Sequence, residues 1–517
     1  MINKITIKNI LAVVAAGSLI AVSCTKNFEN INIHPTDLDP DDMSSVEKVG
    51  TLLPAMIYLL QPQQENNSQM TDQLVYGQLG GYYSAPNMFN NHGGNGHQIA
   101  NWNPQETMYR GPYIDFMSPF YSNYFRIVEE TGGEGAVYVV SNVIKVAIMH
   151  RVADTYGPIP YSKVGSGAFE VEYDALDVLY PKLLEDISSV IASLESYGNT
   201  PSPALAEYDI MFKGDFSKWL KYANSLKFRI AMRISSMNEE LAKTAMQEAM
   251  LSGMLLDNAD NPTLPTNDNP VYKAAVSWGD LCINASITTY MNGYNDPRLA
   301  KYFTRTTGGI YNGLRIGYMP GQIGGASARY SKPGAVQDTP MPVFYAAESW
   351  FLMAEAALKN YITGDAETYY NRAIETSMGQ WNVSAGTYMS RPGGSFAYID
   401  ASNTSNNYTL TSVPGVAWSS ESTQEGHLKQ ILTQKYIANY PFGLESWSDF
   451  RRTGYPELIP TCSLAGAEGV TLERGMRRLK YPDQEYSQNP VNCESAVAKY
   501  FGGQDWFSKD LDWAKKN

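Results

Sequence analysis

Residues 1–24 end in a cysteine, Cys24, and their residue types indicate a specific covalent modification. Lys4 and Lys8 make the start of the chain positive, and residues 11–22 are apolar but too few to span a bilayer. The small Ser23 precedes Cys24 directly. This order is typical of a bacterial lipoprotein export signal, so we expect cleavage after residue 23 and acylation of the Cys24 sulfur and amine. An ordinary secretory signal and an uncleaved anchor are the weaker alternatives.

The rest of the chain lacks the local signatures of common catalytic sites. No serine has glycines two residues before and two residues after it, and there is no Gly-Lys-Ser/Thr phosphate loop, dinucleotide glycine triplet or His-Glu-x-x-His motif. His92 and His97 lie five residues apart, but no Cys, Asp or Glu nearby completes a metal site. We therefore expect no bound metal and no cofactor.

Four acidic residues on predicted helices have the side-chain type that glycoside hydrolysis needs, since that reaction uses a pair of carboxyl groups. They are Glu348, Glu355, Glu445 and Asp449. Arg451 and Arg452 follow the last two closely, so ion pairing and helix capping are the simpler interpretation. We expect the protein not to be an enzyme, and a surface glycoside hydrolase is the alternative.

Aromatic rings make up 12% of the chain, and many stand in the Gly/Asn-rich stretch at about residues 80–115. A ring that stacks on a sugar buries apolar surface at low conformational cost, and amides such as those of Gln98 and Asn101 can pair with hydroxyls. Each ring taken alone is more often part of a core. As a group, the candidate ligand-binding residues are Tyr82, Tyr83, Phe89, Trp102, Tyr109 and Trp278.

The elements that must position these side chains are predicted to be mainly α-helical. Between residues 350 and 378, small and aromatic residues recur at the spacing of a tetratricopeptide helix pair, with Gly364 at the turn. The residues that carry this pattern are Trp350, Ala354, Ala366, Tyr370 and Ala373. We expect tetratricopeptide-like pairs at about 343–380, with poorer copies at about 116–195 and 215–250.

The domain organisation follows from these elements. We expect a signal peptide at 1–23, a lipidated polar tether at 24–43 and one domain at 44–517, whose first helix starts near Ser44 or Ser45. Loop-rich insertions are expected at about 80–115, 257–342 and 382–425. Residues 137–149 are the most apolar later segment, but Asn142 and Lys145 interrupt them, which favours a buried helix over a membrane span.

The net charge limits the kinds of binding partner, and the number of cysteines limits the number of disulfides. The formal net charge of −13 and the absence of a long Lys/Arg run argue against a nucleic-acid partner. Beyond Cys24 the chain has three cysteines, Cys282, Cys462 and Cys493, so at most one intramolecular disulfide forms among them. Cys462 and Cys493 are the closest pair in sequence, and two buried thiols fit almost as well.

Several motifs, taken in order, resemble one family. Residues 431–460 read ILTQKYIANYPFGLESWSDFRRTGYPELIP, and residues 474–492 read RGMRRLKYPDQEYSQNPVN. Earlier motifs are, in chain order, CTKNFENIN, ADTYGPIPYS, WLKYANSLKFRIAMRI, NDPRLAKYF and AESWFLMAEAAL. Together they resemble the SusD-like branch of the SusD/RagB outer-membrane lipoproteins of Bacteroidota.

The resemblance implies a mainly α-helical, tetratricopeptide-containing fold anchored by lipid to the outer leaflet of the outer membrane. It implies capture of oligosaccharides, or less often peptides, and a SusC-like TonB-dependent transporter that the protein covers as a lid. A structural lid with no ligand affinity of its own is a further alternative. Arg451, Arg452 and Tyr481 look like markers of the fold, so we expect the two arginines to clamp helix carbonyls or carboxylates.

Overall fold

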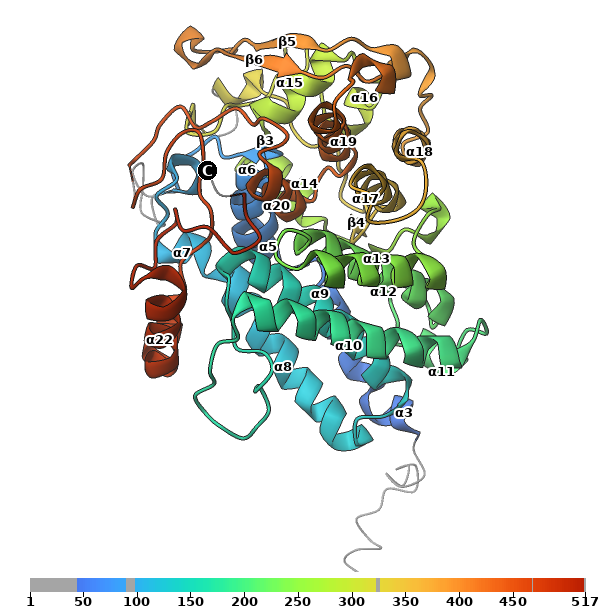
Figure 1. Cartoon of the computed structure of the whole chain (residues 1–517). Coiled ribbons are helices and arrows are strands. Elements are labelled where there is room, and N and C mark those ends of the chain that lie inside the picture. Colours follow the sequence, from blue (N-terminus) through green and yellow to red (C-terminus); the bar gives the residue numbers. More distant parts are fainter. Residues whose placement is uncertain (1–43, 90–97, 322–325, 467, 516–517) are drawn as a thin grey trace, which may run out of the picture.

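The computed structural model describes residues 44–89, 98–321, 326–466 and 468–515 of the 517-residue chain (Figure 1). The predicted signal peptide, Cys24, the tether, His92 and His97 lie outside these residues. Within the described ranges, the chain is mainly helical and its strands form two-stranded sheets. This agrees with the predicted fold class.

The described chain starts where the sequence places the first helix. Helix α3 covers Ser45–Val49, and Ser44 caps its N-terminus. The Ser44 hydroxyl accepts from the Glu47 amide, while the Glu47 carboxylate accepts from the Ser44 amide, which forms a capping box. Short helical segments then follow one another, namely α4 Leu53–Tyr58, α5 Glu65–Ser68, a π-helix at Gln69–Tyr76 and α6 Gly77–Leu79.

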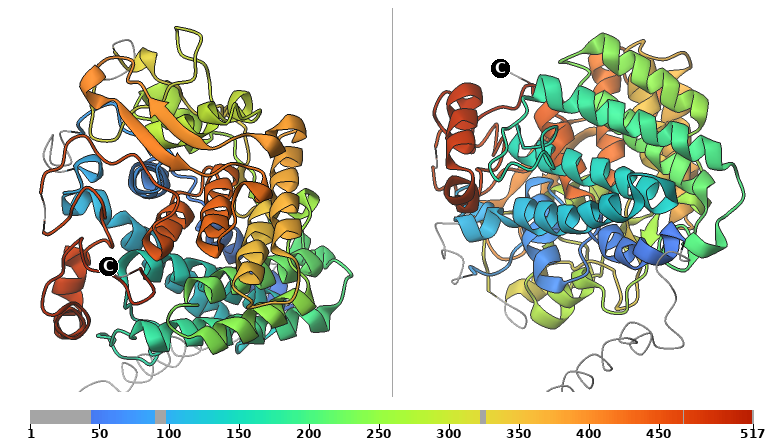
Figure 2. Two further views of the ribbon diagram at one scale, coloured as in Figure 1. Left: turned by 45° about the horizontal axis from the view of Figure 1, so that its top comes forward. Right: turned by 90° about the horizontal axis from the view of Figure 1, so that it is seen from below.

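Long helices form the lower layer of the molecule in Figure 1. They are α8 Gly111–Thr131, α9 Gly135–Tyr156, α10 Leu176–Tyr197, α12 Phe216–Arg233 and α13 Glu239–Ser252, with the short α7 Glu106–Tyr109 and α11 Pro203–Ala206 beside them. Consecutive long helices pack side by side, and the view from below shows them lying across this face (Figure 2). The predicted helical segments at 116–195 and 215–250 are therefore present.

Helix α9 is the one described helix whose length and composition would suit a membrane span, but 78% of its most apolar window is buried inside the protein. Its apolar side chains contact the neighbouring helices on several sides. The prediction of a buried helix over residues 137–149 is confirmed.

A second group of helices packs above the first layer. It consists of α17 Ala346–Leu358, α18 Ala366–Gln380, α19 Gln424–Ala438 and α20 Gly443–Thr453. Helices α17 and α18 form the predicted pair, with Ala354, Tyr370 and Ala373 fully buried between elements. Gly364 turns the chain between them at φ +136°, where a Cβ atom would lie 2.3 Å from the Tyr369 hydroxyl. That the pairs are tetratricopeptide repeats in the strict sense stays a prediction.

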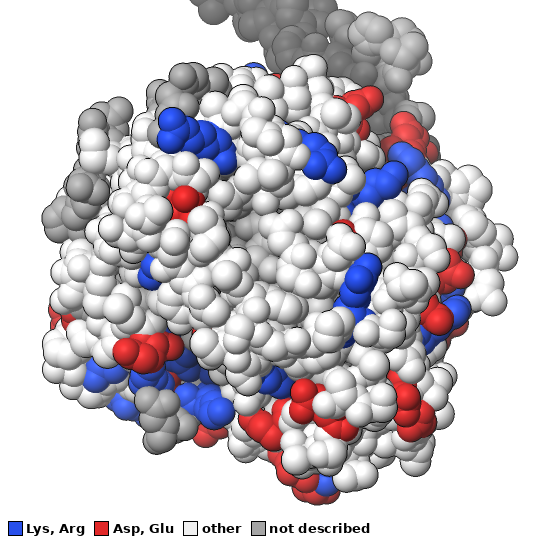
Figure 3. Space-filling view, turned by 90° about the horizontal axis from the view of Figure 1, so that it is seen from above, with Lys and Arg blue, Asp and Glu red and all other residues white. Residues whose placement is uncertain are grey.

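The predicted insertions carry short elements above and beside the helices. They contain α14 Pro270–Tyr272, α15 Ala285–Gly293 and α16 Leu299–Tyr302, and the chain ends with α21 Asp483–Gln488 and α22 Pro490–Phe501. The antiparallel strand pairs are β1 Tyr83–Ser84 with β3 Cys282–Ile283, β2 Thr263–Leu264 with β4 Met341–Pro342, and β5 Gly394–Tyr398 with β6 Tyr408–Val413. The upper face, which bears β5 and β6, carries few charged side chains near its centre (Figure 3).

Buried ion pairs join α12 of the lower layer to α17 and, within the second group, α17 to α20. Arg229 of α12 donates two hydrogen bonds to Glu348 of α17, at 2.9 and 2.7 Å. Arg452 of α20 forms a bidentate pair with Glu355 of α17, at 2.5 and 2.7 Å. Because each of these side chains is buried, their charges must be satisfied inside the protein.

The remaining members of this network confirm the roles expected for the arginine pair. Asp449 accepts from Lys435 at 2.8 Å and from Arg452 at 3.1 Å. Arg451 instead donates to the backbone carbonyls of Asp154 and Arg477 at 2.7 and 3.0 Å, and its guanidinium lies 3.6 Å from the centre of the Trp447 ring. Arg452 thus binds carboxylates and Arg451 binds carbonyls.

The three cysteines in the described chain are all free. Cys282 and Cys493 are buried, whereas Cys462 is exposed, so the predicted pairing of Cys462 with Cys493 is wrong. Burial raises the pKa of the Cys282 and Cys493 thiols to about 12 and keeps them protonated at neutral pH. The alternative, that Cys462 and Cys493 are two buried thiols, holds for Cys493 and is wrong for Cys462.

Replacing Glu355 by Gln should destabilise the protein by about 3 kcal/mol, because the buried Arg452 guanidinium would lose its bidentate partner and keep only Asp449. The midpoint of urea unfolding measures this change. Glu367→Gln on the exposed side of α18 is the matched control and should change stability by less than about 0.5 kcal/mol. Equal midpoints for the two variants would contradict a structural role for the Glu355–Arg452 pair.

Candidate ligand-binding site

A cavity of about 470 Å³ lies where α6, α20 and the start of α15 meet strand β6. The segments 457–460 and 472–476 close its remaining sides. Its volume is within the range of small-molecule sites, which occupy roughly 300–1,000 Å³. The cavity is therefore large enough for part of an oligosaccharide chain.

Trp102 forms one wall of the cavity and holds an uncommon backbone conformation. It ends a 3-10 turn at Ile99–Asn101 with φ +57°, in the left-handed region that bulky residues rarely adopt. Its amide donates to the Ile99 carbonyl at 2.9 Å, and its ring lies against Gly475. The residue is 8% exposed. Backbone strain of this kind is common at ligand sites, so Trp102 is a candidate functional residue.

Two further rings, Tyr408 of β6 and Phe450 of α20, are half-buried in the cavity wall. Burial, with the nearby Glu457 carboxylate, raises the pKa of the Tyr408 hydroxyl, which stays protonated and lies 3.4 Å from that carboxylate. Trp447 lies deeper, where its indole nitrogen donates to the Met476 carbonyl at 2.9 Å. The wall thus presents apolar ring surface of the kind that sugars stack on.

Polar groups in the wall supply hydrogen-bond acceptors. Gln78 is 3% exposed, and its amide nitrogen donates to the Leu74 carbonyl at 2.6 Å, but its side-chain oxygen has no partner among the residues that the structure describes. A buried acceptor without a donor is costly, so this oxygen suits a donor from a bound molecule. The Ser286 hydroxyl, in contrast, already accepts from the Ile459 amide at 3.0 Å.

Of the six rings predicted to bind ligand, Trp102 alone is among the residues that line this cavity. Tyr82 and Tyr83 are buried in the core, contrary to the expectation that they stand exposed on a loop. Tyr82 stacks on Tyr436 with the ring centres 4.9 Å apart and donates to the Tyr436 carbonyl at 2.6 Å. Tyr83 packs edge-on against Tyr440.

The other three predicted rings also lie elsewhere. Tyr109 is buried and packs edge-on against Phe507, while Phe89 and Trp278 are half-buried against the core. These rings bury apolar area under the polar insertions, which explains why the 80–115 stretch is rich in aromatics. Tyr408 and Phe450 were missed because nothing in their local sequence separates them from core rings.

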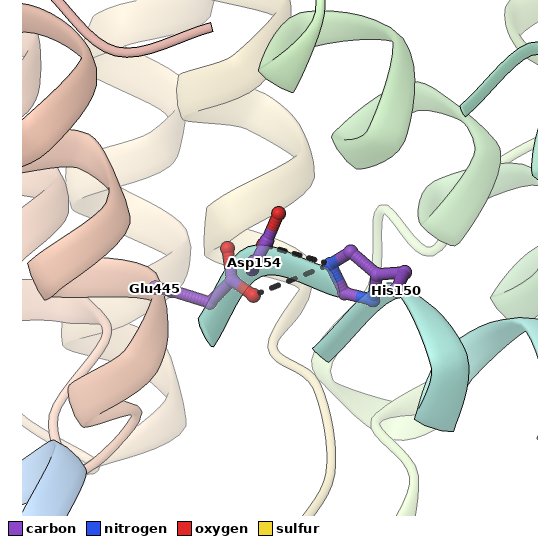
Figure 4. Close-up of side chains that lie close together, drawn as sticks. All are labelled: His150, Asp154 and Glu445. Atoms are coloured by element: carbon purple, nitrogen blue, oxygen red, sulfur yellow. Dashed lines mark ion pairs between the residues drawn. The ribbon is translucent and has the colours of Figure 1, made fainter. Parts of the chain in front are cut away.

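A second cluster of titratable groups lies in the core between α9 and α20 (Figure 4). The His150 Nε2 atom is 3.4 Å from Asp154 and 3.8 Å from Glu445. These residues have the side-chain types of a metal site, but Arg233 already binds both carboxylates, at 3.0 and 2.6 Å. A cation there would add charge to a cluster that Arg229 and Arg233 already neutralise.

The pKa shifts in this cluster fit a structural role. Burial lowers the pKa of His150 despite the two carboxylates, so the imidazole is neutral at pH 7. Burial alone would raise the pKa of Glu445, but Arg229 and Arg233 outweigh it and hold the pKa well below its usual range. All three residues are buried, which leaves them out of contact with a substrate.

The fold and the cavity define a mainly helical binding protein with an aromatic-lined site. The family model for the SusD and RagB outer membrane lipoproteins, of the SusD-like group, matches residues 30–514. This chain therefore belongs to the SusD/RagB family of outer membrane lipoproteins. No curated protein matches it.

Solved structures of this family resemble the chain over most of its length. A SusD-like protein from Bacteroides thetaiotaomicron is 33% identical, with a TM-score of 0.84, and the match covers 91% of this chain and 99% of that one. A SusD homolog from Bacteroides uniformis is also 33% identical, with a TM-score of 0.82 and coverage of 92% and 100%.

A third related structure is that of a chitin-binding SusD homolog from Flavobacterium johnsoniae. It is 30% identical, with a TM-score of 0.80, and the match covers 90% of this chain and 98% of that one. A glycan-binding relative thus shares the fold over nearly its whole length.

Acidification should weaken the fold through the buried carboxyl groups. Burial alone would raise the pKa of Glu355, but Arg452 and Lys359 outweigh it, so the pKa values of Glu355 and Glu445 both lie well below the unfolded value of about 4.3. Their contribution is fully present above that value and is lost as the pH falls toward the folded pKa.

We expect the midpoint of urea unfolding to fall steadily between about pH 5 and pH 3. The Glu355→Gln variant, which has one such carboxyl fewer, should lose less stability over the same range. A midpoint that is independent of pH across this range would contradict the low pKa values of these groups.

Proposed function

We propose that this protein is a surface-exposed lipoprotein that binds oligosaccharides in the cavity beside Trp102 and delivers them to a SusC-like TonB-dependent transporter, which it covers as a lid. The observation that carries the proposal is the cavity itself, with Trp102, Tyr408 and Phe450 in its wall. Family membership and the chitin-binding relative support a glycan as the ligand. Peptides are the less favoured ligand class.

The geometry suits binding without chemical change. Rings stack on the apolar faces of sugars, and acceptors such as the Gln78 oxygen pair with hydroxyl groups. The carboxyl groups that first suggested glycoside hydrolysis, Glu348, Glu355, Glu445 and Asp449, form buried ion pairs in the helix core. A pair of carboxyl groups held in that way has no room for a substrate between them.

Replacing Trp102 by Ala should weaken glycan binding by about tenfold, because a stacking surface is lost. Isothermal titration calorimetry of the soluble domain against chitin, cellulose, xylan and starch oligosaccharides measures the change. Trp102→Phe keeps a ring and should lose less affinity, and Trp278→Ala, whose ring does not line the cavity, should bind as the wild type does. Equal affinity of Trp102→Ala and the wild type would contradict this location of the site.

The same glycans separate the alternative functions. Release of new reducing ends during incubation would identify a hydrolase. An absence of heat with every glycan and peptide, combined with recovery of a large β-barrel in a pull-down, would favour a structural lid. Binding without cleavage is the result that the proposal requires.

Replacing Cys24 by Ala should release the protein from the outer membrane, because no acyl chains would be attached. Cell fractionation and protease accessibility of intact cells measure anchoring and surface exposure. The secreted variant should keep the thermal stability and glycan affinity of the wild-type domain, since residues 44–515 bear the fold and the cavity. Unchanged membrane anchoring in the variant would contradict lipidation at Cys24.

A further inference from the structure

The side chains that carry charge at neutral pH in the described wall of the cavity are all acidic. Among the described residues of its wall, Glu457 and Glu473 carry charge, and no lysine or arginine is present. One arginine, Arg315, lies beside the wall, with its guanidinium 5.3 Å from the centre of the Tyr408 ring. Arg315 donates to the carbonyls of Pro460 and Asn406 at 2.9 and 3.0 Å. The wall therefore has a net negative charge.

The two carboxylates lie in different surroundings. Glu457 is half-buried, and its neighbour Tyr408 approaches its carboxylate with the ring hydroxyl. Glu473 is exposed, and hydrogen bonds from its own backbone amide and from Thr471 lower the pKa of its carboxyl group. A ligand that extends from the interior to the exposed part of the cavity would meet a negative charge at both positions.

A third group favours donors on the ligand. Gln78 lines the same cavity, and its buried side-chain oxygen lacks a partner among the described residues. Hydroxyl groups of any sugar can satisfy it, and an ammonium group does so with a stronger, charge-assisted bond. An ammonium group is also attracted to the face of a ring such as that of Trp102.

We propose that the cavity selects oligosaccharides that carry free, protonated amino groups, as in deacetylated chitin, over neutral glycans, and selects neutral glycans over uronates. This inference rests on the proposed function and specifies the ligand of the same site. An amine gains hydrogen bonds and charge attraction from Glu457 and Glu473, whereas the carboxylate of a uronate is repelled by them.

Calorimetry with four tetrasaccharides at about pH 6 tests this order of affinities. The probes are glucosamine tetramer, its fully N-acetylated form, cellotetraose and tetragalacturonate. We expect the glucosamine tetramer to bind about three- to tenfold more tightly than the two neutral sugars, and tetragalacturonate to bind most weakly. Raising the salt concentration from about 50 to 500 mM should reduce the preference for the amine, because screening weakens exposed charge pairs.

The double variant Glu457→Gln/Glu473→Gln should bring the affinities for the amino and N-acetylated tetramers within about twofold of each other. Glu170→Gln, at an exposed carboxyl outside the cavity, is the matched control and should preserve the full preference. Equal binding of amino and N-acetylated sugars to the wild type, or a preference unchanged in the double variant, would overturn this inference and leave the proposed function standing.

Two other outcomes would also overturn this inference. If no glycan binds at all, the proposed function fails together with this inference. If a lysine-rich peptide binds more tightly than the glucosamine tetramer and competes with it, the cavity is a site for basic peptides and the assignment to amino sugars is overturned.

Discussion

The buried contact of Arg233 with Asp154 and Glu445 is the constraint on which much of this structure depends, since it joins α12, α9 and α20 at one point. Three charges removed from water must be placed accurately, because a misplaced partner leaves a buried ion unpaired. Neighbouring pairs extend the same requirement to α17 and α19 through Glu348 and Lys435. The network therefore fixes the relative positions of helices from both layers.

The cavity depends on this network through helix α20. Its carboxyl and guanidinium groups point into the charged core, while Trp447 and Phe450 of the same helix line the cavity. Arg451 accepts a bond at its carbonyl from Arg477 at 2.7 Å and donates one to the Arg477 carbonyl at 3.0 Å, which fixes the segment that carries Gly475. A side chain that never touches the ligand thus helps position the wall around Trp102.

The sequence predicted the helices well because their signals are local. The capping box at Ser44, the small residues at Ala354 and Ala373 and the turn at Gly364 each follow from neighbours along the chain. The rings that line the cavity were predicted poorly, because a ring beside a core and a ring beside a cavity have the same local pattern. Tyr82 lies under an insertion and Trp102 lines the cavity, although both stand among Gly and Asn residues.

The cavity wall is assembled from parts of the chain that are far apart in sequence, from Gln78 in α6 to Tyr408 in β6 and Met476 near the C-terminus. Contacts between such distant residues require large loops to close, so they are expected to form late in folding. A partly folded chain cannot build this wall, because residues 457–476 come late in the sequence. The cavity is therefore complete only when folding is nearly complete.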